Sequence, residues 1–481
     1  MTLSQSFPQS RCRAGVSAGD ITPPVGIYHR MWGAAKHDRS TGVHRPLQQT
    51  TLALAPADGD DSQLSVFIGL DHCLFWHREM SDLLEAVSAG SGIPVDRITV
   101  FFSHTHAAGL MGYEREELPG GELIRDYLKQ LGEILAESVR TAVSRLTPAT
   151  IAYETGRCNL AQNRDLVDPE TGDYVCGYRP SGIADASVLV GRISDNATKQ
   201  PLLTLVNYAC HPTTLAWDNT LISPDYVGAM REVIEQRTAA PTLFIQGASG
   251  DIGPREGFVD DVEVADRNGR QLGYAVLSAW ENLPPAGQRF QYTGAVISGA
   301  TIGTWQFAPI DEGEAREQSE WKEQTLTLDL PYRHDLPEKD KLLEERAHWT
   351  EKEREALDDD DAKTAADCRA IIERCTRRLT RVESLTPGET YPYRWKYWKL
   401  GDAIWIALDG EHYNLLQREL RQKFPGVPIV VGTLANGSHV WYLPDEHSYG
   451  LGLYQETASV LARGSLEMLI GNIADTLQEL L

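Results

Sequence analysis

The chain has 481 residues, a net charge of -23 at pH 7 and a hydrophobic content of 42%. This length allows several cores at roughly 100–200 residues per domain. The acidic balance argues against a nucleic-acid partner, because phosphate binding depends on an excess of Lys and Arg, and against docking on an anionic membrane face. No stretch approaches the ~20 uncharged apolar residues of a membrane span.

The N-terminal sequence MTLSQSFPQSRCRAG has no apolar core of the kind that a secretory signal carries. We therefore expect a cytoplasmic protein, unless a leader has been removed. The seven cysteines are odd in number and lack Cys-x-x-Cys spacing, which is typical of a reducing compartment. We expect neither disulfides nor a thiolate zinc site, and we expect a small-molecule substrate. The oligomeric state is left open.

Between residues 50 and 305, short β-rich apolar runs alternate with helical patterns, which is typical of an α/β domain. The expected strands are 51–54, 64–70, 98–102, 202–209, 242–246 and 294–302. The expected helices are 121–146, 224–237 and 265–282. Ser223-Pro224 supplies an N-cap and a first-turn proline for the second helix.

Residues 335–385 are charged and helical in pattern, with opposite charges at i,i+4 around an acidic break. We interpret them as a helical hairpin inserted over the α/β body. Strands at 394–400, 403–408 and 427–433 and an amphipathic helix at 453–480 follow. The predicted fold is thus α/β, with a mixed sheet core flanked by helices and an inserted helical hairpin, and residues 1–481 form a single catalytic domain.

Polar clusters follow four of the predicted strands directly. They are residues 103–106 after ITVFF, 211–214 after LLTLVNYAC, 247–251 after TLFIQ and 409–413 after AIWIAL. Ligand sites in open α/β sheets form at the carboxyl ends of strands. The shared placement therefore predicts that these clusters converge.

The clusters contain residues that bind zinc in other proteins. His104 and His106 are two apart, so in an extended strand end they point the same way. Imidazole is the commonest zinc ligand, and a catalytic zinc takes about three N/O ligands and leaves one position open. The spacing alone fits a structural histidine pair equally well, and His211, Glu411 and Tyr442 taken singly are typical of packing or surface positions.

Eight motifs, taken in order, resemble the neutral/alkaline ceramidase family over about residues 13–465. They are Gly19-Asp20-Ile21-Thr22-Pro23-Pro24, SHTH at 103–106, Asn163-Arg164, NYACHPTT at 207–214, Ser223-Pro224-Asp225, GASGDIGP at 247–254, Gly410-Glu411 and the segment from Tyr442 to Tyr449. Each motif is weak alone. The ordered set is specific for the superfamily but not for the substrate.

The resemblance implies one catalytic zinc ion per chain. Its ligands would be His104, His211, Glu411 and Tyr442, while His106, Arg164 and Tyr449 would line the substrate amide. A zinc-bound hydroxide would attack the carbonyl.

We expect three further roles around that zinc ion. Arg164 and Tyr449 would stabilise the oxyanion, and His106 would move the proton. The carboxylates of Asp20, Asp225 and Asp251 would orient the zinc histidines.

Two features depart from the ceramidase pattern. Residues 250–255 read Gly-Asp-Ile-Gly-Pro-Arg where ceramidases carry Gly-Asp-Val-Ser-Pro-Asn, so Gly253 occupies the position of their required serine. We also expect no C-terminal immunoglobulin-like domain. The sequence therefore predicts a zinc-dependent hydrolase acting on an amide bond of a small or N-acylated substrate. Two alternatives stay open: a zinc enzyme acting on a polar, sugar-like metabolite, and a catalytically silent metal-binding protein.

Overall fold

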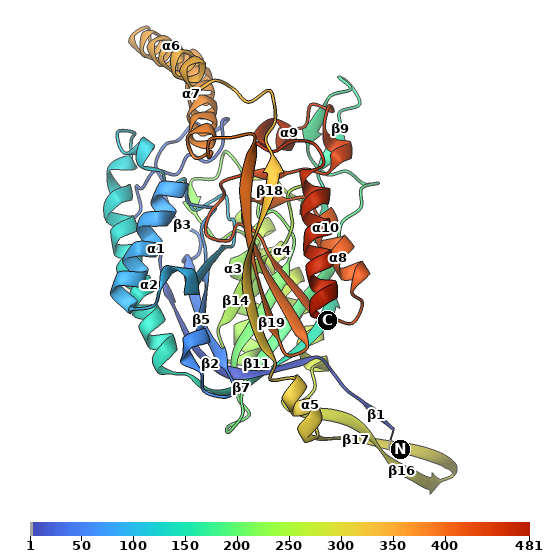
Figure 1. Cartoon of the computed structure of the whole chain (residues 1–481). Coiled ribbons are helices and arrows are strands. Elements are labelled where there is room, and N and C mark those ends of the chain that lie inside the picture. The colour runs from blue at the N-terminus through green and yellow to red at the C-terminus, as the bar shows by residue number, and fades with distance from the viewer. Residues whose placement is uncertain (1–2) are drawn as a thin grey trace.

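An eight-stranded mixed sheet lies at the centre of the computed structural model, which describes residues 3–481 (Figure 1). Its strands are, in spatial order, β14 (Thr242–Gln246), β12 (Pro201–Tyr208), β11 (Ser187–Asp195), β7 (Thr147–Arg157), β2 (Gln9–Asp20), β4 (Gln48–Pro56), β5 (Ser65–Leu70) and β6 (Ile98–Phe102). The pairs β5–β6 and β12–β14 are parallel, and the others are antiparallel. The predicted mixed sheet core is confirmed.

A second sheet packs against the first. It contains β18 (Trp321–Pro331), β19 (Thr390–Leu400), β20 (Ala403–Leu408) and β22 (Ile429–Gly432). Large aromatic side chains fill the space between the sheets, and the rings of Phe67 and Trp398 meet edge to face at 4.8 Å. The backbone N–H of Thr433 donates to the carbonyl of Gln246 at 3.0 Å. The carboxyl ends of β14 and β22 therefore lie side by side.

Helices cover the outer faces of both sheets. The first sheet packs on α1 (His77–Ser91), α2 (Ile124–Ser144), α3 (Tyr226–Thr238) and α4 (Val262–Asn282), and the second packs on α8 (Leu415–Lys423) and α10 (Ser465–Leu480). These helices are amphipathic: α2, for example, buries Tyr127, Leu128, Leu131 and Leu135 at helical spacing. Within residues 3–481, no helix combines the length and apolar character that crossing a membrane requires.

Pairs of short strands connect the loops at the carboxyl ends of the main strands. These pairs are β3 (Gly42–Val43) with β13 (Leu221–Ile222), β8 (Ala161–Asn163) with β15 (Ile252–Pro254), β9 (Asp165–Val167) with β10 (Tyr174–Cys176), and β21 (Glu411–His412) with β23 (Tyr442–Leu443). In the last pair Glu411 lies opposite Tyr442. Two predicted ligands that are distant in sequence are thus backbone neighbours.

Three predicted elements need correction. Residues 294–302 are not one strand: β16 (Gln288–Ser298) and β17 (Ala300–Pro309) form a hairpin that turns at Gly299, where φ is 74°. This hairpin pairs with β1 (Ser4–Gln5) and projects from the body beside α5 (Glu312–Glu317) (Figure 1).

The other two corrections concern helices. The region 453–480 divides into α9 (Tyr454–Ala458) and α10, because the backbone is extended at Ser459 after α9 and left-handed at Gly464, with φ 88°, before α10. Helix α3 begins at Tyr226, and the carboxylate of Asp225 caps it in place of Ser223.

Residues 335–385 contain α6 (Lys339–Asp358) and α7 (Ala362–Glu383), which project from the body at one end (Figure 1). The second half of α7 is anchored to the body by a buried carboxylate. Glu373 accepts hydrogen bonds from the Tyr28 hydroxyl at 2.7 Å and from Arg115 at 2.9 Å. This anchor holds the end of α7 beside the loops described next.

Candidate metal centre

His104, His211 and Glu411, called the triad below, meet at the carboxyl ends of β6, β12 and β20. Nε2 of His104 lies 3.0 Å from Nε2 of His211 and 3.2 Å from Oε2 of Glu411, and Nε2 of His211 lies 3.7 Å from the same oxygen. All three side chains are buried. The structure thus brings together three of the four residues predicted as metal ligands.

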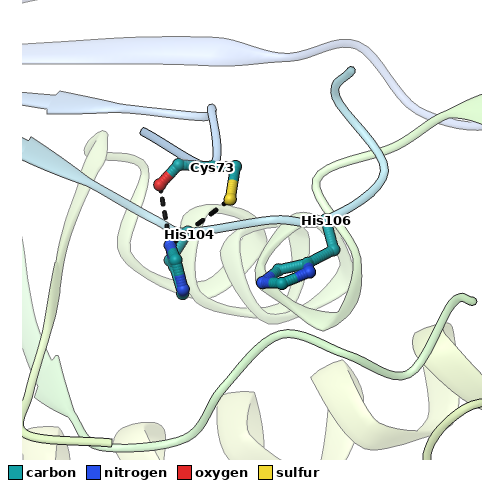
Figure 2. A group of neighbouring side chains, drawn as sticks. All are labelled: Cys73, His104 and His106. Atoms are coloured by element: carbon teal, nitrogen blue, oxygen red, sulfur yellow. Dashed lines mark hydrogen bonds between the residues drawn. The ribbon is translucent and has the colours of Figure 1, made fainter. Parts of the chain in front are cut away.

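The tautomers of the two histidines favour a cation between them. Nδ1 of His104 lies 2.7 Å from the carbonyl oxygen of Cys73 (Figure 2), and Nδ1 of His211 lies 3.2 Å from that of Ser249. A carbonyl only accepts, so each Nδ1 carries the proton and each Nε2 presents a lone pair. Two lone pairs and a carboxylate oxygen then face one point, an arrangement that a metal ion stabilises.

The spacing of the triad also fits zinc. A tetrahedral zinc ion bound at ~2.0–2.1 Å to its ligands holds ligand atoms roughly 3.3 Å apart. The separations of 3.0, 3.2 and 3.7 Å lie around that value. The backbone of His104 is left-handed, with φ 68°, which costs energy in a residue other than glycine. This conformation turns the imidazole of His104 toward the second sheet instead of leaving it in line with β6.

A second group of potential ligands, Cys73, His104 and His106, lies beside the triad. Figure 2 shows that the Cys73 thiol and carbonyl both face the same nitrogen of His104, at 3.6 and 2.7 Å. That nitrogen is Nδ1, which carries a proton while it bonds to the carbonyl. The triad, which uses Nε2, is therefore the better metal site.

Tyr442 lies beside the triad. Its hydroxyl accepts a hydrogen bond from the Arg164 guanidinium at 3.1 Å, and its ring lies nearly parallel to that of His211 at 6.4 Å. Burial raises the pKa of Tyr442 well above its ordinary value, and the nearby Glu411 raises it further, while Arg164 opposes this. The predicted fourth ligand thus lies close enough to Glu411 for the two side chains to shift each other's pKa.

Arg164 adds positive charge to this site. Besides the Tyr442 hydroxyl, its guanidinium donates to the Gly250 carbonyl at 2.7 Å. Its Nε is buried and has no partner among residues 3–481. Burial alone would raise the pKa of Glu411, but the neighbouring His104 and Arg164 help to hold it below its ordinary value. Glu411 therefore stays ionised, the state that binding a metal ion would require.

His106 lies beside the triad without belonging to it. Its ring centroid is 4.9 Å from that of His104, 5.1 Å from that of His211 and 5.1 Å from that of Trp32. Its buried Nε2 has no partner within the described chain. Burial lowers the pKa of His106 well below its ordinary value, and the positive charges of Arg164 and Arg377 lower it further. The imidazole is therefore neutral and can accept a proton.

The structure does not use the three predicted carboxylates to orient the histidines. Asp20 accepts from the backbone of Thr22 at 2.7 Å, Asp225 caps α3, and Asp251 accepts from the backbone of Asn414 at 2.6 Å. Backbone carbonyls occupy the two Nδ1 positions instead. Asp251 does support the site indirectly, because Asn414 follows the loop that carries Glu411.

Tyr449 is not brought to the triad, contrary to the role predicted for it. Its hydroxyl donates to the Leu461 carbonyl at 2.9 Å. Tyr454, which we did not predict, packs edge to face on Tyr442 with ring centroids 5.8 Å apart. Tyr454 is the first residue of α9. No sequence signal separates one tyrosine from the other in this segment.

Gly253 lies on β15 in the wall of a cavity of about 160 Å³ that Arg164 and Thr213 also line. A Cβ at this position would lie 3.5 Å from Oγ1 of Thr213 and 3.8 Å from Cβ of His211. These are ordinary contacts, so the position has room for a side chain. It borders the triad, as expected from its place in the sequence.

Comparisons with known proteins agree with this geometry. Residues 13–258, slightly more than half of the chain, match the family described as neutral/alkaline non-lysosomal ceramidase, N-terminal. No curated protein matches the chain in sequence.

Among solved structures, the chain is similar to neutral ceramidase from Pseudomonas aeruginosa, with TM-score 0.63 and 15% identity over 99% of this chain and 75% of that one. It is also similar to a ceramidase complexed with C2, with TM-score 0.64 and 15% identity over 99% of this chain and 76% of that one. At this identity the two structures support the fold, and the sequence match supports the lineage. The chain belongs to the neutral/alkaline non-lysosomal ceramidase family.

Proposed function

We propose that the protein is a zinc-dependent hydrolase that cleaves an amide C–N bond in a small or N-acylated substrate. Membership of the ceramidase family suggests an amide hydrolase. The observation that carries the proposal is the convergence of two Nε2 lone pairs and one carboxylate oxygen on a single buried point. One zinc ion per chain, held by His104, His211 and Glu411 with Tyr442 as a fourth ligand, accounts for this arrangement.

When bound, zinc supplies Lewis-acid chemistry and lowers the pKa of a coordinated water from 15.7 toward ~7. The protein contributes the remaining charges. The Arg164 guanidinium lies against Tyr442 and has an unpartnered buried Nε, so it can donate to the oxygen of a carbonyl under attack. Because the surroundings exclude water, this interaction is stronger than it would be in solvent.

Proton transfer falls to His106. Its Nε2 is buried, unpartnered within residues 3–481 and next to both triad histidines. A neutral imidazole in this position accepts a proton from the attacking water and returns it to the leaving nitrogen. We assign to Tyr454 the role expected of Tyr449, because the ring of Tyr454 packs on Tyr442.

A substrate panel tests the proposal. The purified chain, with and without added zinc, is assayed against short N-acyl amides, peptides, esters and glycosides. We expect zinc-dependent hydrolysis of N-acyl amides above all other classes. Turnover of glycosides alone would favour the sugar-like alternative. A chain that binds zinc but turns over nothing would favour the silent alternative and end the hydrolase proposal.

A further inference from the structure

A cavity of about 240 Å³ lies between α7, the loop after β18 and the residues that follow α9. Arg333, Arg378 and Arg381 line it, together with a single acidic residue, Asp335. Ligand pockets for drug-sized molecules have about 300–1,000 Å³. This cavity therefore suits a small charged group better than a lipid chain.

Arg381 is a buried cation that has no ion-pair partner in the described chain. Its side chain is only 7% exposed, its guanidinium lies 3.8 Å from the centre of the Trp441 ring, and its Nε has no partner in the described chain. No carboxylate within residues 3–481 forms an ion pair with it at 4.0 Å or less. Burying a charge without pairing it is costly. A ligand that brings a negative charge would offset this cost.

Other buried arginines of the chain form ion pairs with buried carboxylates. Arg115 pairs with Glu373 at 2.9 Å, and Arg231 forms two bonds with Asp71, at 2.9 and 3.0 Å. Arg381 is buried to a similar degree, but its guanidinium lies over the Trp441 ring and no carboxylate pairs with it within residues 3–481. The difference indicates that its partner comes from outside the chain.

Of the other two arginines that line the cavity, one has an ion-pair partner and one has none within residues 3–481. Arg333 is already neutralised by Asp335, which it contacts at 2.7 and 2.8 Å. Arg378 is partly exposed and forms neither a hydrogen bond nor an ion pair through its side chain within residues 3–481. Arg378 and Arg381 are three positions apart on α7, so they lie on the same face of the helix.

Arg381 also connects the cavity to the metal centre. Trp441, which it covers, precedes the predicted ligand Tyr442, and the hydroxyl of Tyr454 lies next to the guanidinium. Tyr454 in turn packs on Tyr442 at 5.8 Å. These contacts place the cavity beside the segment that carries the predicted ligand Tyr442.

We propose that the substrate carries an anionic group, a carboxylate or a phosphate, which binds Arg381 and Arg378 in this cavity while its amide lies at the triad. The placement of the amide at the triad rests on the proposed hydrolase function. The anion site itself rests on the unpaired arginines alone.

Paired substrates test the proposal. N-butanoylglycine and N-butanoylglycinamide differ only in whether the far end is a carboxylate or a neutral amide. With the zinc-loaded full chain, we expect kcat/KM to be about 10- to 100-fold higher for the carboxylate, the range of a charge-assisted hydrogen bond. Arg381→Gln should bring this ratio close to one, and Arg378→Gln should lower it in part. N-butanoyl-aminoethyl phosphate shows whether phosphate is preferred over carboxylate.

Arg374→Gln is the matched control, because it makes the same change on α7 at an exposed residue whose partner is Glu345. It should leave the ratio unchanged. Circular dichroism checks the fold of each variant, and Arg378→Gln keeps the test valid if Arg381→Gln does not fold. Equal kcat/KM for both substrates in the unmodified protein would overturn the anion site while leaving the hydrolase function intact.

If neither compound is hydrolysed, binding decides the question. Titration calorimetry of the same protein should then show at least tenfold tighter binding of N-butanoylglycine than of its amide, a difference that Arg381→Gln removes. That result would support the anion site although the hydrolase function had failed. Equal affinity for the two compounds would end the proposal.

Discussion

Nε2 of His104 lies 3.2 Å from Oε2 of Glu411, although 307 positions separate the two residues in the chain. His104 follows a strand of the first sheet, and Glu411 follows a strand of the second. The two meet only when the sheets have packed together. A metal ion bound here therefore links the two halves of the core, and its binding free energy adds to the stability of the fold.

The first prediction concerns the metal ligands. We expect the purified protein to hold about one zinc per chain, and His104→Ala or His211→Ala to remove metal and activity while circular dichroism stays unchanged. Elemental analysis and turnover measure the two effects. Cys73→Ser is the control, because its thiol belongs only to the neighbouring group. Loss of zinc in Cys73→Ser with retention in His211→Ala would show that the metal binds to that group instead.

The second prediction separates the oxyanion donor from the ligands. Arg164→Ala should keep zinc bound and lower kcat by about 10²–10³, the usual cost of losing one such donor. The reason is that the guanidinium contacts Tyr442 and Gly250 but none of the triad atoms directly. Elemental analysis alongside kinetics checks both parts. If Arg164→Ala lost zinc as readily as His211→Ala, the assignment of Arg164 to the substrate would be wrong.

The third prediction compares two tyrosines. Tyr454→Phe should lower kcat on N-acyl substrates, because its hydroxyl is next to Arg381 and its ring packs on Tyr442. Tyr449→Phe should leave kcat unchanged and cost about 1 kcal/mol of unfolding free energy, because it removes only the hydroxyl's bonds to the Leu461 carbonyl and to Ser459. Turnover assays and thermal unfolding distinguish the two effects. A large loss of kcat in Tyr449→Phe alone would instead support Tyr449 as the tyrosine that lines the substrate amide.

The parts of the site that sequence could predict follow apolar strands directly. Strands 98–102, 242–246 and 403–408 were predicted to the residue, because short, strongly apolar runs end abruptly in polar loops. His104 and Glu411 stand at the ends of two of them. Strands β2 and β7 carried little signal, because charged and small residues interrupt them and their neighbours in the sheet supply the hydrogen bonds.

Other parts of the site leave no mark in the sequence. Every residue has a carbonyl, so nothing distinguishes Cys73 and Ser249 as the partners of the two histidines. Arg381 lies on a helix whose charges predict an exposed surface, but it is buried because the end of α7 packs on Trp441 of the body. Such positions depend on how distant elements pack, which local patterns do not encode.

The fourth prediction concerns pH. Burial, followed by the charge of Asp165, raises the pKa of Asp251 to about 7 from 3.8. A raised carboxyl pKa means that the folded protein holds its proton more tightly than the unfolded chain does. The stabilisation from this group is fully present below about pH 4 and is lost as pH rises through about 7.

Asp251→Asn should remove this dependence, because an amide does not titrate and its oxygen can still accept from Asn414. The difference in unfolding free energy between variant and wild type should grow from pH 4 to pH 7, by roughly 4 kcal/mol at most. Denaturant unfolding at several pH values measures it. Asp475→Asn, at an exposed side chain on α10, should show no such trend. A pH-independent difference for Asp251→Asn would contradict the raised pKa.

The last prediction concerns Gly253 and ceramide. A serine side chain fits at this position, since its Cβ would make only ordinary contacts with Thr213 and His211. Gly253→Ser should therefore fold normally and reduce the cavity of about 160 Å³ beside Arg164. We expect it to gain no ceramidase activity, because the cavities of about 160 Å³ beside Arg164 and about 240 Å³ beside Arg381 are too small for a lipid with two long chains. Gly257→Ser, in the wall of the same cavity, is the control for loss of volume alone. Its Cβ would lie 3.0 Å from the Thr213 carbonyl oxygen, so some loss of stability is expected there.

Assays with long-chain ceramide and short N-acyl amides measure the outcome. Hydrolysis of ceramide by the unmodified protein, at a rate equal to that of its best polar substrate, would contradict the expected preference for small polar substrates.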